Sequence, residues 1–251
     1  MSVGTVYLVG AGPGAPDLIT LRGANLLASA DIVFHDALVH PQTLALAERA
    51  EKVLVGKRCG RHSAAQRFIN KRLIDAAHAH RVVVRLKGGD PMLFGRAQEE
   101  ISALEAAGVR YEVVPGVTAA LGASAELGIS LTRRGVSRSV VFVTPRVGAG
   151  ETPGHDWASA VAASDTAVIY MGAHEADKIA AALLARGLSP VLPVVAVENA
   201  TLPDCTHTAL TLAELPRIAA GRHSGPVALL LGDVYAAALA ARLPLAKAAA
   251  A

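Results

Sequence analysis

A loop dense in glycine and proline follows the first apolar run of the chain. After Val6–Val9, residues 10–14 read GAGPG. Glycine lets a ligand approach the backbone closely, and proline fixes the path of a loop. The spacing G-x-G-x-G is not the G-x-G-x-x-G of dinucleotide-binding loops. The next helix is also expected only from about Thr20, which is too late to place its N-terminus on a pyrophosphate. The loop alone is a weak indication of a ligand.

A second glycine-rich segment follows the apolar run Val82–Leu86. It places two adjacent glycines, Gly88 and Gly89, directly before Asp90. Adjacent glycines after a strand indicate a place where a ligand touches the main chain. The Asp90 carboxylate could hydrogen-bond a ribose or an amine. The alternative is a tight turn in which Asp90 caps the following helix.

A third segment, PGVTAA at 115–120, offers backbone amides and the hydroxyl of Thr118. Taken alone, it is equally typical of a capped helix start. Because Pro115-Gly116 interrupts the pattern of the chain, we place a domain boundary there. We expect an N-terminal domain over 1–115, a C-terminal domain over 116–245 and a tail over 246–251. A cleft between two such domains is a natural site for a small molecule.

Basic residues gather in two stretches that contain no acidic residue. Six lie between Lys57 and Arg72, and four lie between Arg133 and Arg146, in a chain whose formal net charge is only +3. Such clusters suggest an anionic ligand. The alternative is that they are solvated faces of helices and loops. We expect no nucleic-acid partner and no membrane partner.

Apolar β-branched runs alternate with helical periodicity along the chain. One helix should begin at Thr20 as its N-cap, another should cover 97–107 and stop at Gly108, and a third should stop at Gly187. This alternation predicts an α/β fold of two α/β domains, with a mostly parallel N-terminal sheet and a mixed C-terminal sheet. The expected strands are 6–9, 32–34, 53–55, 82–86, 111–114, 139–143, 166–170, 194–197 and 227–231.

Composition limits the classes of protein further. Apolar residues make up 52% of the 251 residues and charged residues 18%, so a sizeable core is expected and disorder is not. The most apolar windows are far shorter than the roughly 20 residues that span a bilayer. Two cysteines form no disulfide framework, so we expect a cytoplasmic protein.

Five segments together resemble the tetrapyrrole methylase family, and within it the uroporphyrinogen-III C-methyltransferases. The most discriminating is RLKGGDP over 85–91, followed by FGR over 94–96. Related precorrin-4 enzymes carry a Thr-Gly-Asp-Pro version instead. The other segments are VYLVGAGPGAPDLITLRG over 6–23, GKRCGRHSAAQRFIN over 56–70, PGVTAA over 115–120 and ENATLPD over 198–204.

The resemblance implies a fold, a cofactor and a set of contacts. It implies two α/β domains that hold S-adenosyl-L-methionine, folded up, in the cleft between them, usually in a homodimer. The product of the cofactor is S-adenosyl-L-homocysteine. Met171 alone would be interpreted as a core residue, so its role depends on the resemblance. The positions similar to cofactor contacts are Pro13, Gly88, Gly89, Asp90, Leu93, Thr118, Ala119, Met171, Ala200 and Ala228.

By the same resemblance, Asp36 is the proton acceptor and Lys57 the proton donor. Asp36 follows the expected strand 32–34 and Lys57 follows the next one, at the edge where open α/β sheets place ligands. The alternative is an ordinary surface ion pair. The implied reaction is methylation of uroporphyrinogen III twice to give precorrin-2, on the route to sirohaem and cobalamin, without a metal.

The implied substrate carries eight carboxylates, so basic residues near strand ends become candidates for binding it. Arginine binds carboxylates in a bidentate manner. Gln66 and Asn70, four residues apart, share one face of the helix that carries Arg67 and Lys71. The candidates for substrate binding are Arg85, Lys87, Arg96, Arg134 and Arg138.

Three alternatives remain open. Another precorrin methylase would act on a later intermediate, although RLKGGDP argues against it. A nicotinamide-dependent oxidoreductase would need a helix that begins near Gly14 and an acid on the ribose, a role that Asp36 could imitate. A tetrapyrrole-binding protein without activity would not need Asp36 and Lys57.

Overall fold

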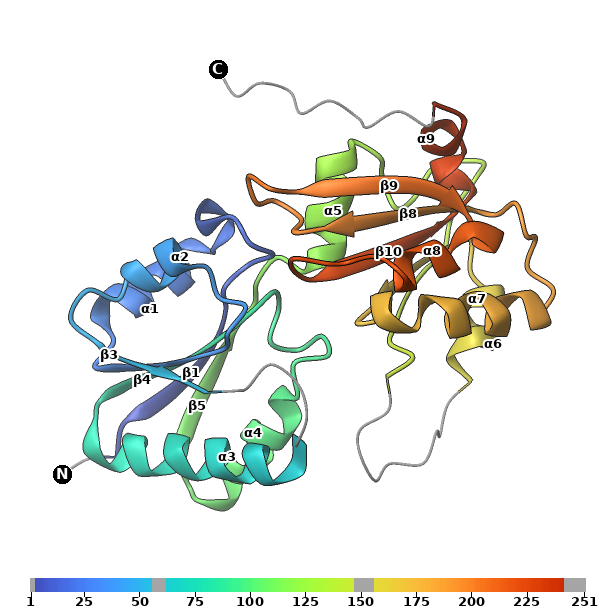
Figure 1. The fold of residues 1–251 in the computed structure, drawn as a ribbon. Helices are drawn as coiled ribbons and strands as arrows, with labels where there is room; N and C mark the ends of the chain where they lie inside the picture. The colour runs from blue at the N-terminus through green and yellow to red at the C-terminus, as the bar shows by residue number, and fades with distance from the viewer. Residues whose placement is uncertain (1–2, 56–61, 147–155, 242–251) are drawn as a thin grey trace. The chain divides into compact units, whose positions relative to one another are not determined.

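The chain forms two compact units, which divide between Ala119 and Ala120. The computed structural model describes residues 3–55, 62–146 and 156–241. Each unit is built on one five-stranded sheet with helices packed on it (Figure 1). The α/β class and the two sheets are as the sequence predicts. The units part four residues after Pro115, where the sequence analysis places the boundary.

The sheet of the first unit is parallel throughout. Its order is β3-β2-β4-β1-β5, so β1 lies between β4 and β5. In a parallel sheet the carboxyl ends of all strands meet at one edge, and the loops after β1, β2, β4 and β5 therefore share that edge. The strands are β1 (Thr5–Gly10), β2 (Ile32–His35), β3 (Glu51–Leu54), β4 (Val82–Lys87) and β5 (Arg110–Val114).

Helices cover both faces of this sheet (Figure 1). Alternate residues of a strand point to opposite faces. Accordingly Leu8 packs with Leu73 and Ile101, whereas Val9 packs with Leu27. The helices are α1 (Leu21–Ser29) and α2 (Pro41–Ala45) on one face and α3 (His62–Ala79) and α4 (Ala97–Ala106) on the other, and a 3-10 turn covers Pro16–Leu18.

Local signals fix where these helices begin and end. The Thr20 hydroxyl accepts a hydrogen bond from the Gly23 amide at 3.1 Å, which confirms Thr20 as the N-cap of α1. The chain leaves α4 through Gly108 at φ +66°, as expected of a glycine that follows a helix. A helix that begins at Leu21 places no N-terminus near Gly14, which the nicotinamide alternative requires.

The sheet of the second unit is mixed, as predicted. In the order β6-β7-β10-β8-β9, β6 and β7 are parallel and the other pairs are antiparallel. The sequence pattern does not predict β9, because THTALT holds four polar residues and only Ala209 and Leu210 are apolar. It is an edge strand, and exposed and partly buried residues alternate over its first four positions. The strands are β6 (Val140–Val143), β7 (Thr166–Tyr170), β8 (Pro193–Glu198), β9 (Thr206–Thr211) and β10 (Val227–Gly232).

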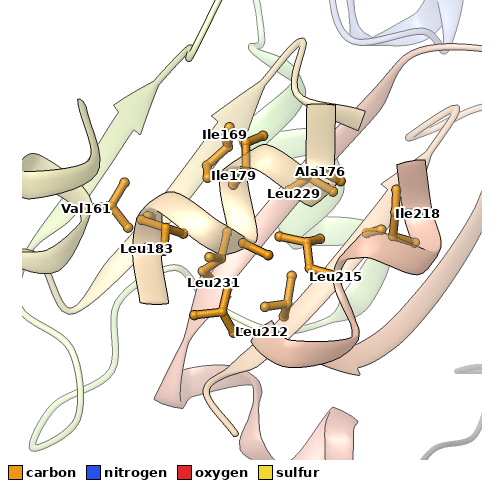
Figure 2. Close-up of a cluster of buried hydrophobic side chains, with 14 of the residues drawn as sticks. Val161, Ile169, Ala176, Ile179, Leu183, Leu212, Leu215, Ile218, Leu229 and Leu231 are labelled. Carbon is orange, nitrogen blue, oxygen red and sulfur yellow. The ribbon is translucent and has the colours of Figure 1, made fainter. Parts of the chain in front are cut away.

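One face of this sheet carries a cluster made only of apolar side chains (Figure 2). Ile169 on β7 and Leu229 on β10 meet Ile179 and Leu183, and none of the four is more than 1% exposed. The helices of the unit are α5 (Ala119–Leu127), α6 (Trp157–Ala162), α7 (Ala176–Ala185), α8 (Pro216–Ala219) and α9 (Ala236–Ala241), with 3-10 turns at Ala173–Glu175, Leu212–Glu214 and Asp233–Tyr235.

Within the described residues, no helix combines the length and the apolar character needed to cross a membrane.

Candidate active site

The three glycine-rich segments of the sequence meet at the carboxyl edge of the first sheet. The loop after β1 pairs with the loop after β4: the Gly89 amide donates to the Gly12 carbonyl at 2.7 Å, and the Gly12 amide donates to the Gly89 carbonyl at 3.3 Å. The Ala11 amide donates to the Lys87 carbonyl at 2.8 Å. The two loops therefore continue the parallel sheet as a short paired extension.

Gly10 and Gly116 allow the third segment to join this extension. A Cβ on Gly116 would lie 2.3 Å from the Gly89 carbonyl oxygen, and a Cβ on Gly10 would lie 2.6 Å from the Gly116 Cα. These neighbours are backbone atoms, which cannot rotate away. Only glycine fits at either position, so the close approach serves packing between the loops themselves.

Gly88 and Gly89 are different, because space is open beside them. A Cβ on Gly88 would meet only the Leu38 side chain, at 3.5 Å, and one on Gly89 would lie 3.9 Å from the Thr118 Cα. Gly89 also has φ +67°, a conformation that favours glycine. The main chain of the GGDP segment is thus accessible to a ligand, as the sequence analysis predicts.

Asp90 ties two of these segments together. One carboxylate oxygen accepts from the Met92 amide at 2.8 Å, and the other accepts from the Gly116 amide at 2.9 Å. The side chain therefore holds its own turn and the PGVT segment. It does not cap the next helix, since α4 begins only at Ala97. Its contact with a cofactor stays a prediction.

Four charged side chains form a network beneath this edge. Arg85 donates from Nη2 to Asp36 Oδ1 at 2.6 Å and from Nε to Glu100 Oε1 at 3.0 Å. Lys87 Nζ donates to the other oxygen of Glu100 at 2.9 Å. Glu100 is fully buried, Arg85 and Lys87 are each 3% exposed, and the Asp36 side chain is 31% exposed. The network thus runs from the interior to an accessible carboxylate.

The network perturbs its two cations in opposite directions. Burial works against the charged form of Arg85, but the charges of Asp36 and Glu100 outweigh it and raise the pKa of the guanidinium. Burial lowers the pKa of Lys87, and the positive charge of Arg85 adds to this effect against the attraction of Glu100. Arg85 is therefore the more firmly charged member of the pair.

Of the predicted catalytic pair, the structure describes Asp36. Asp36 directly follows β2, as expected, and its amide donates to the Leu86 carbonyl at 3.3 Å. Lys57 lies outside the described residues. The cation that contacts Asp36 in the described part of the chain is Arg85, which the sequence analysis assigns to the substrate. That assignment stays a prediction, while the structure places Arg85 in ion pairs within the protein.

Of the other predicted substrate residues, Lys87 is buried, whereas Arg96, Arg134 and Arg138 are accessible. Arg96 has φ +55° and pairs with Glu99 through Nε at 2.6 Å and Nη2 at 2.7 Å. Arg134 and Arg138 are exposed in the second unit. The backbone amide of Arg138 donates to Asp165 at 2.8 Å, and this hydrogen bond together with the Arg138 charge helps to lower the pKa of that carboxyl.

Three predicted cofactor contacts belong to the second unit, at the ends of neighbouring strands. Met171 follows β7 with φ +57° and is 47% exposed, so it is not the core residue that its position after a strand suggests. Ala228 lies opposite Tyr170 on β7 and Val197 on β8. Ala200 packs in the same apolar cluster as Ala228. The residues are thus close together within this unit.

Of the remaining predicted contacts, Pro13, Leu93 and Thr118 lie on loops of the first unit and Ala119 is the first residue of α5, and all four are partly exposed. The sequence analysis missed Glu100. A signal was present, because Glu100 shares with Ala97, Ile101 and Leu104 the spacing of one buried helix face. An acid on an apolar face indicates a buried partner of opposite charge.

The fold and this edge define a two-unit α/β protein with a candidate ligand site at the carboxyl ends of a parallel sheet. Residues 5–216 match the family model of the Tetrapyrrole (Corrin/Porphyrin) Methylases. The chain belongs to this family.

Individual relatives and solved structures show which members of the family the chain is similar to. The chain is 45% identical to a siroheme synthase of Psychrobacter sp. (strain PRwf-1) over 235 residues, which is 93% of this chain and 48% of the relative. It thus spans about half the length of the curated relatives it matches. The native uroporphyrin III C-methyl transferase from Thermus thermophilus shares 40% identity and a TM-score of 0.82, over 93% of this chain and 100% of that one. The same Thermus enzyme complexed with S-adenyl homocysteine gives 39% and 0.80, with the same coverage.

Proposed function

We propose that this chain is an S-adenosylmethionine-dependent C-methyltransferase that methylates uroporphyrinogen III twice to give precorrin-2. The observation that carries the proposal is the meeting of the three glycine-rich loops at one sheet edge, in a member of the tetrapyrrole methylases. The complex of the Thermus relative with S-adenyl homocysteine supports the cofactor. Precorrin-2 is a precursor of both sirohaem and cobalamin.

The residues present fit this cofactor. Gly88 and Gly89 have no side chains, and the space beside them is open. Their main-chain donors and acceptors are therefore accessible, which suits an uncharged adenosine more than a phosphate. In the part of the chain that the structure describes, the basic residues nearest that turn in the sequence are Arg85 and Lys87, and both are buried in ion pairs. We assign the cofactor to Pro13, Gly88, Gly89, Asp90, Leu93, Thr118, Ala119, Met171, Ala200 and Ala228.

The cofactor, when bound, supplies a methyl group activated by a positive sulfonium. The protein's task is to align the pyrrole carbon with it, and alignment of this kind contributes up to roughly 7–11 kcal/mol in favourable intramolecular reactions. Methyl transfer to a fully substituted pyrrole carbon leaves the macrocycle with a positive charge, which it loses by releasing a proton from another of its atoms. Asp36 is the residue that accepts this proton, because it is an accessible carboxylate at the ligand edge. Arg96, Arg134 and Arg138 are the accessible candidates to bind substrate carboxylates.

The direct test is incubation of the full chain with freshly reduced uroporphyrinogen III and methyl-labelled cofactor. We expect two labels per macrocycle, and we expect S-adenosylhomocysteine to bind in calorimetry whereas NAD does not. Transfer of no label would overturn the proposal. Transfer only to later precorrins would favour another member of the family.

The role of Asp36 is tested by Asp36→Asn, which keeps the shape of the side chain and removes its charge. We expect binding of S-adenosylhomocysteine to stay within about twofold and turnover to fall by on the order of a hundredfold. The matched control is Asp75→Asn, because Asp75 is an exposed acid paired with Lys71 on α3. Unchanged turnover in Asp36→Asn would remove Asp36 from the mechanism.

We also propose that the protein acts as a homodimer in the cytoplasm, which the resemblance to the family supports. Light scattering of the purified chain tests the dimer. A monomer at micromolar concentration that retains full activity would contradict it.

A further inference from the structure

We propose that Glu100 is the positioning residue for Asp36 and acts on it through Arg85. The inference rests on the proposed function, because it takes Asp36 as the group that accepts the proton. It changes the role that the sequence suggests for Arg85 and Lys87, from clamps on the substrate to supports of the base.

Glu100 is the centre of the buried network. Its carboxylate accepts from three side chains on two elements other than its own helix: Arg85 and Lys87 of β4, and Gln66 of α3, whose Nε2 lies 3.3 Å from Oε1. None of its surface is exposed. A carboxylate held by two cations and an amide has one orientation, so it is a rigid reference point within the sheet.

Arg85 transmits this orientation to Asp36. Its guanidinium is planar, so fixing Nε at Glu100 also fixes the direction of Nη2, which holds Asp36 at 2.6 Å. Its third nitrogen, Nη1, donates to the Leu86 carbonyl at 3.2 Å. Each nitrogen of Arg85 is thus committed to a protein oxygen. Arg85 is also only 3% exposed, so a substrate carboxylate has little access to its remaining N–H groups.

A second set of contacts braces Glu100 from the side of α3. Gln66 also donates to Asn70 Oδ1 at 3.0 Å, and Asn70 Nδ2 donates to the Glu99 carbonyl at 3.1 Å. These two polar residues, four apart on α3, therefore secure the first turn of α4, which carries Glu100. They face the network and not a ligand.

The charges within the network balance, with two carboxylates against two cations. Buried ion pairs of this kind contribute little net stability compared with apolar side chains of the same volume. A stabilising role alone therefore does not explain why a parallel sheet interior should contain them. The need to orient an accessible base, Asp36, at one end of the network explains why these buried charges are present.

The test compares Glu100→Gln with the matched control Glu105→Gln, an exposed acid on the same helix. The measurement is the single-turnover rate of methyl transfer to uroporphyrinogen III, counted per S-adenosylhomocysteine-binding site well below the unfolding temperature. We expect the rate to fall at least about tenfold in Glu100→Gln, because small misplacement of a catalytic group is costly. The KM for the macrocycle and the binding of S-adenosylhomocysteine should stay within about threefold, and the control should match the wild type.

A purely structural role for Glu100 would reduce the number of binding sites and leave the rate per site unchanged, and that result would overturn the proposal. Should Glu100→Gln fail to bind S-adenosylhomocysteine at all, the charge-balanced variant Lys87→Met/Glu100→Gln gives the same readout. It should also lose at least about tenfold in rate per site, since it too lacks the fixed carboxylate.

A double-mutant cycle tests the route through Arg85. Arg85→Lys cannot reach Glu100 and Asp36 together, so we expect a loss similar to that of Glu100→Gln and little further loss when the two are combined. Losses that multiply would overturn the coupling, and a raised KM with unchanged rate would return Arg85 to the substrate. If the wild type transfers no methyl group, the proposed function fails and this inference fails with it. If the wild type transfers methyl groups and the variants do so at the same rate, the proposed function stands and this inference alone fails.

Discussion

The two units of the molecule differ in what they bury. Among the described residues, the first unit encloses Arg85, Lys87 and Glu100 within its parallel sheet and the helix beside it. In the described part of the second unit the buried polar side chains are neutral, and one face of the sheet carries a large buried apolar cluster (Figure 2). Both units have sheets of the same number of strands, so size does not explain the difference.

The two units therefore offer different groups to a ligand: charged side chains in the first unit and apolar side chains in the second. In the first unit, interior charge lies directly behind the loops and leads to Asp36. In the second unit, the predicted contacts Ala200 and Ala228 belong to an apolar cluster and bring no charge. We infer that the first unit supplies reactive and orienting groups, whereas the second supplies shape. Changes to one or the other should therefore have effects of different kinds.

The largest expected effect on stability is in the apolar face. Leu183→Ala empties space at a residue with no exposed surface, and substitutions of this type cost about 2–5 kcal/mol. We expect the free energy of unfolding in urea to fall by that amount. Leu184→Ala is the matched control, because Leu184 is 38% exposed on the same helix and should cost far less. Equal losses would mean that this face is not closely packed.

The next effect is at the ligand edge of the first unit. Gly116→Ala places a methyl group 2.3 Å from the Gly89 carbonyl, so the loops must shift, at a cost of about 1–3 kcal/mol. We expect the affinity for S-adenosylhomocysteine in calorimetry to fall by about tenfold or more. Gly221→Ala, at an exposed glycine of the second unit, should bind as the wild type does. Normal binding by Gly116→Ala would show that the three loops move independently.

We expect a substitution at Tyr235 to increase stability, because its hydroxyl is a polar group buried in an apolar cluster of the second unit. The Tyr235 hydroxyl is buried and has no hydrogen-bond partner among the residues that the structure describes, and burial raises the pKa of the phenol. Tyr235→Phe removes an unsatisfied group whose burial costs about 1 kcal/mol or more, so it should raise the free energy of unfolding by about 1 kcal/mol. Tyr111→Phe removes a satisfied, exposed hydroxyl and should bring no gain. A loss in Tyr235→Phe would point to a partner for the hydroxyl.

The smallest effect concerns pH and the second unit. Burial works against the charged form of His223, but hydrogen bonds to Glu198 at 3.1 Å and to the Ile218 carbonyl at 2.9 Å raise its pKa above the ordinary 6.5. The stabilisation is therefore complete below about pH 6.5 and is lost as the pH rises through the raised value.

For a partly exposed pair of this kind the loss should be about 0.5–1 kcal/mol. Unfolding free energies measured at pH 6 and pH 8.5 should differ by this amount more in the wild type than in His223→Gln. The same pH dependence in both proteins would show that the pair contributes nothing.

Much of the fold follows from the sequence, because buried parallel strands are continuous apolar runs. Val6–Val9 and Ile32–Phe34 are examples, and Gly108 and Gly187 mark helix ends without any tertiary information. The edge strand β9 could not be predicted from its residues, because THTALT contains only two apolar residues, Ala209 and Leu210. It is a strand because it pairs antiparallel with the preceding strand β8, which a sequence pattern does not show.

The site was predictable in part for the same reason. Glycine spacing located the three loops, but it could not show that Gly10 and Gly116 serve packing whereas Gly88 and Gly89 leave space. The charges of Arg85 and Lys87 suggested an anionic substrate, since a sequence does not show that Glu100 lies within reach of both. Glu100 is 15 residues from Arg85 and 13 residues from Lys87 in the sequence, and only the folded sheet and helix bring these side chains into contact.

The contact among positions 10, 89 and 116 limits how this protein can vary. A larger residue at position 116 requires the chain at position 89 to take another course, and position 10 would have to give way as well. These three positions should therefore change together or not at all when natural variants are compared. A variant library that randomises them one at a time would recover almost nothing but glycine at 10 and 116, while joint randomisation would reveal the few alternative backbones that this edge can adopt.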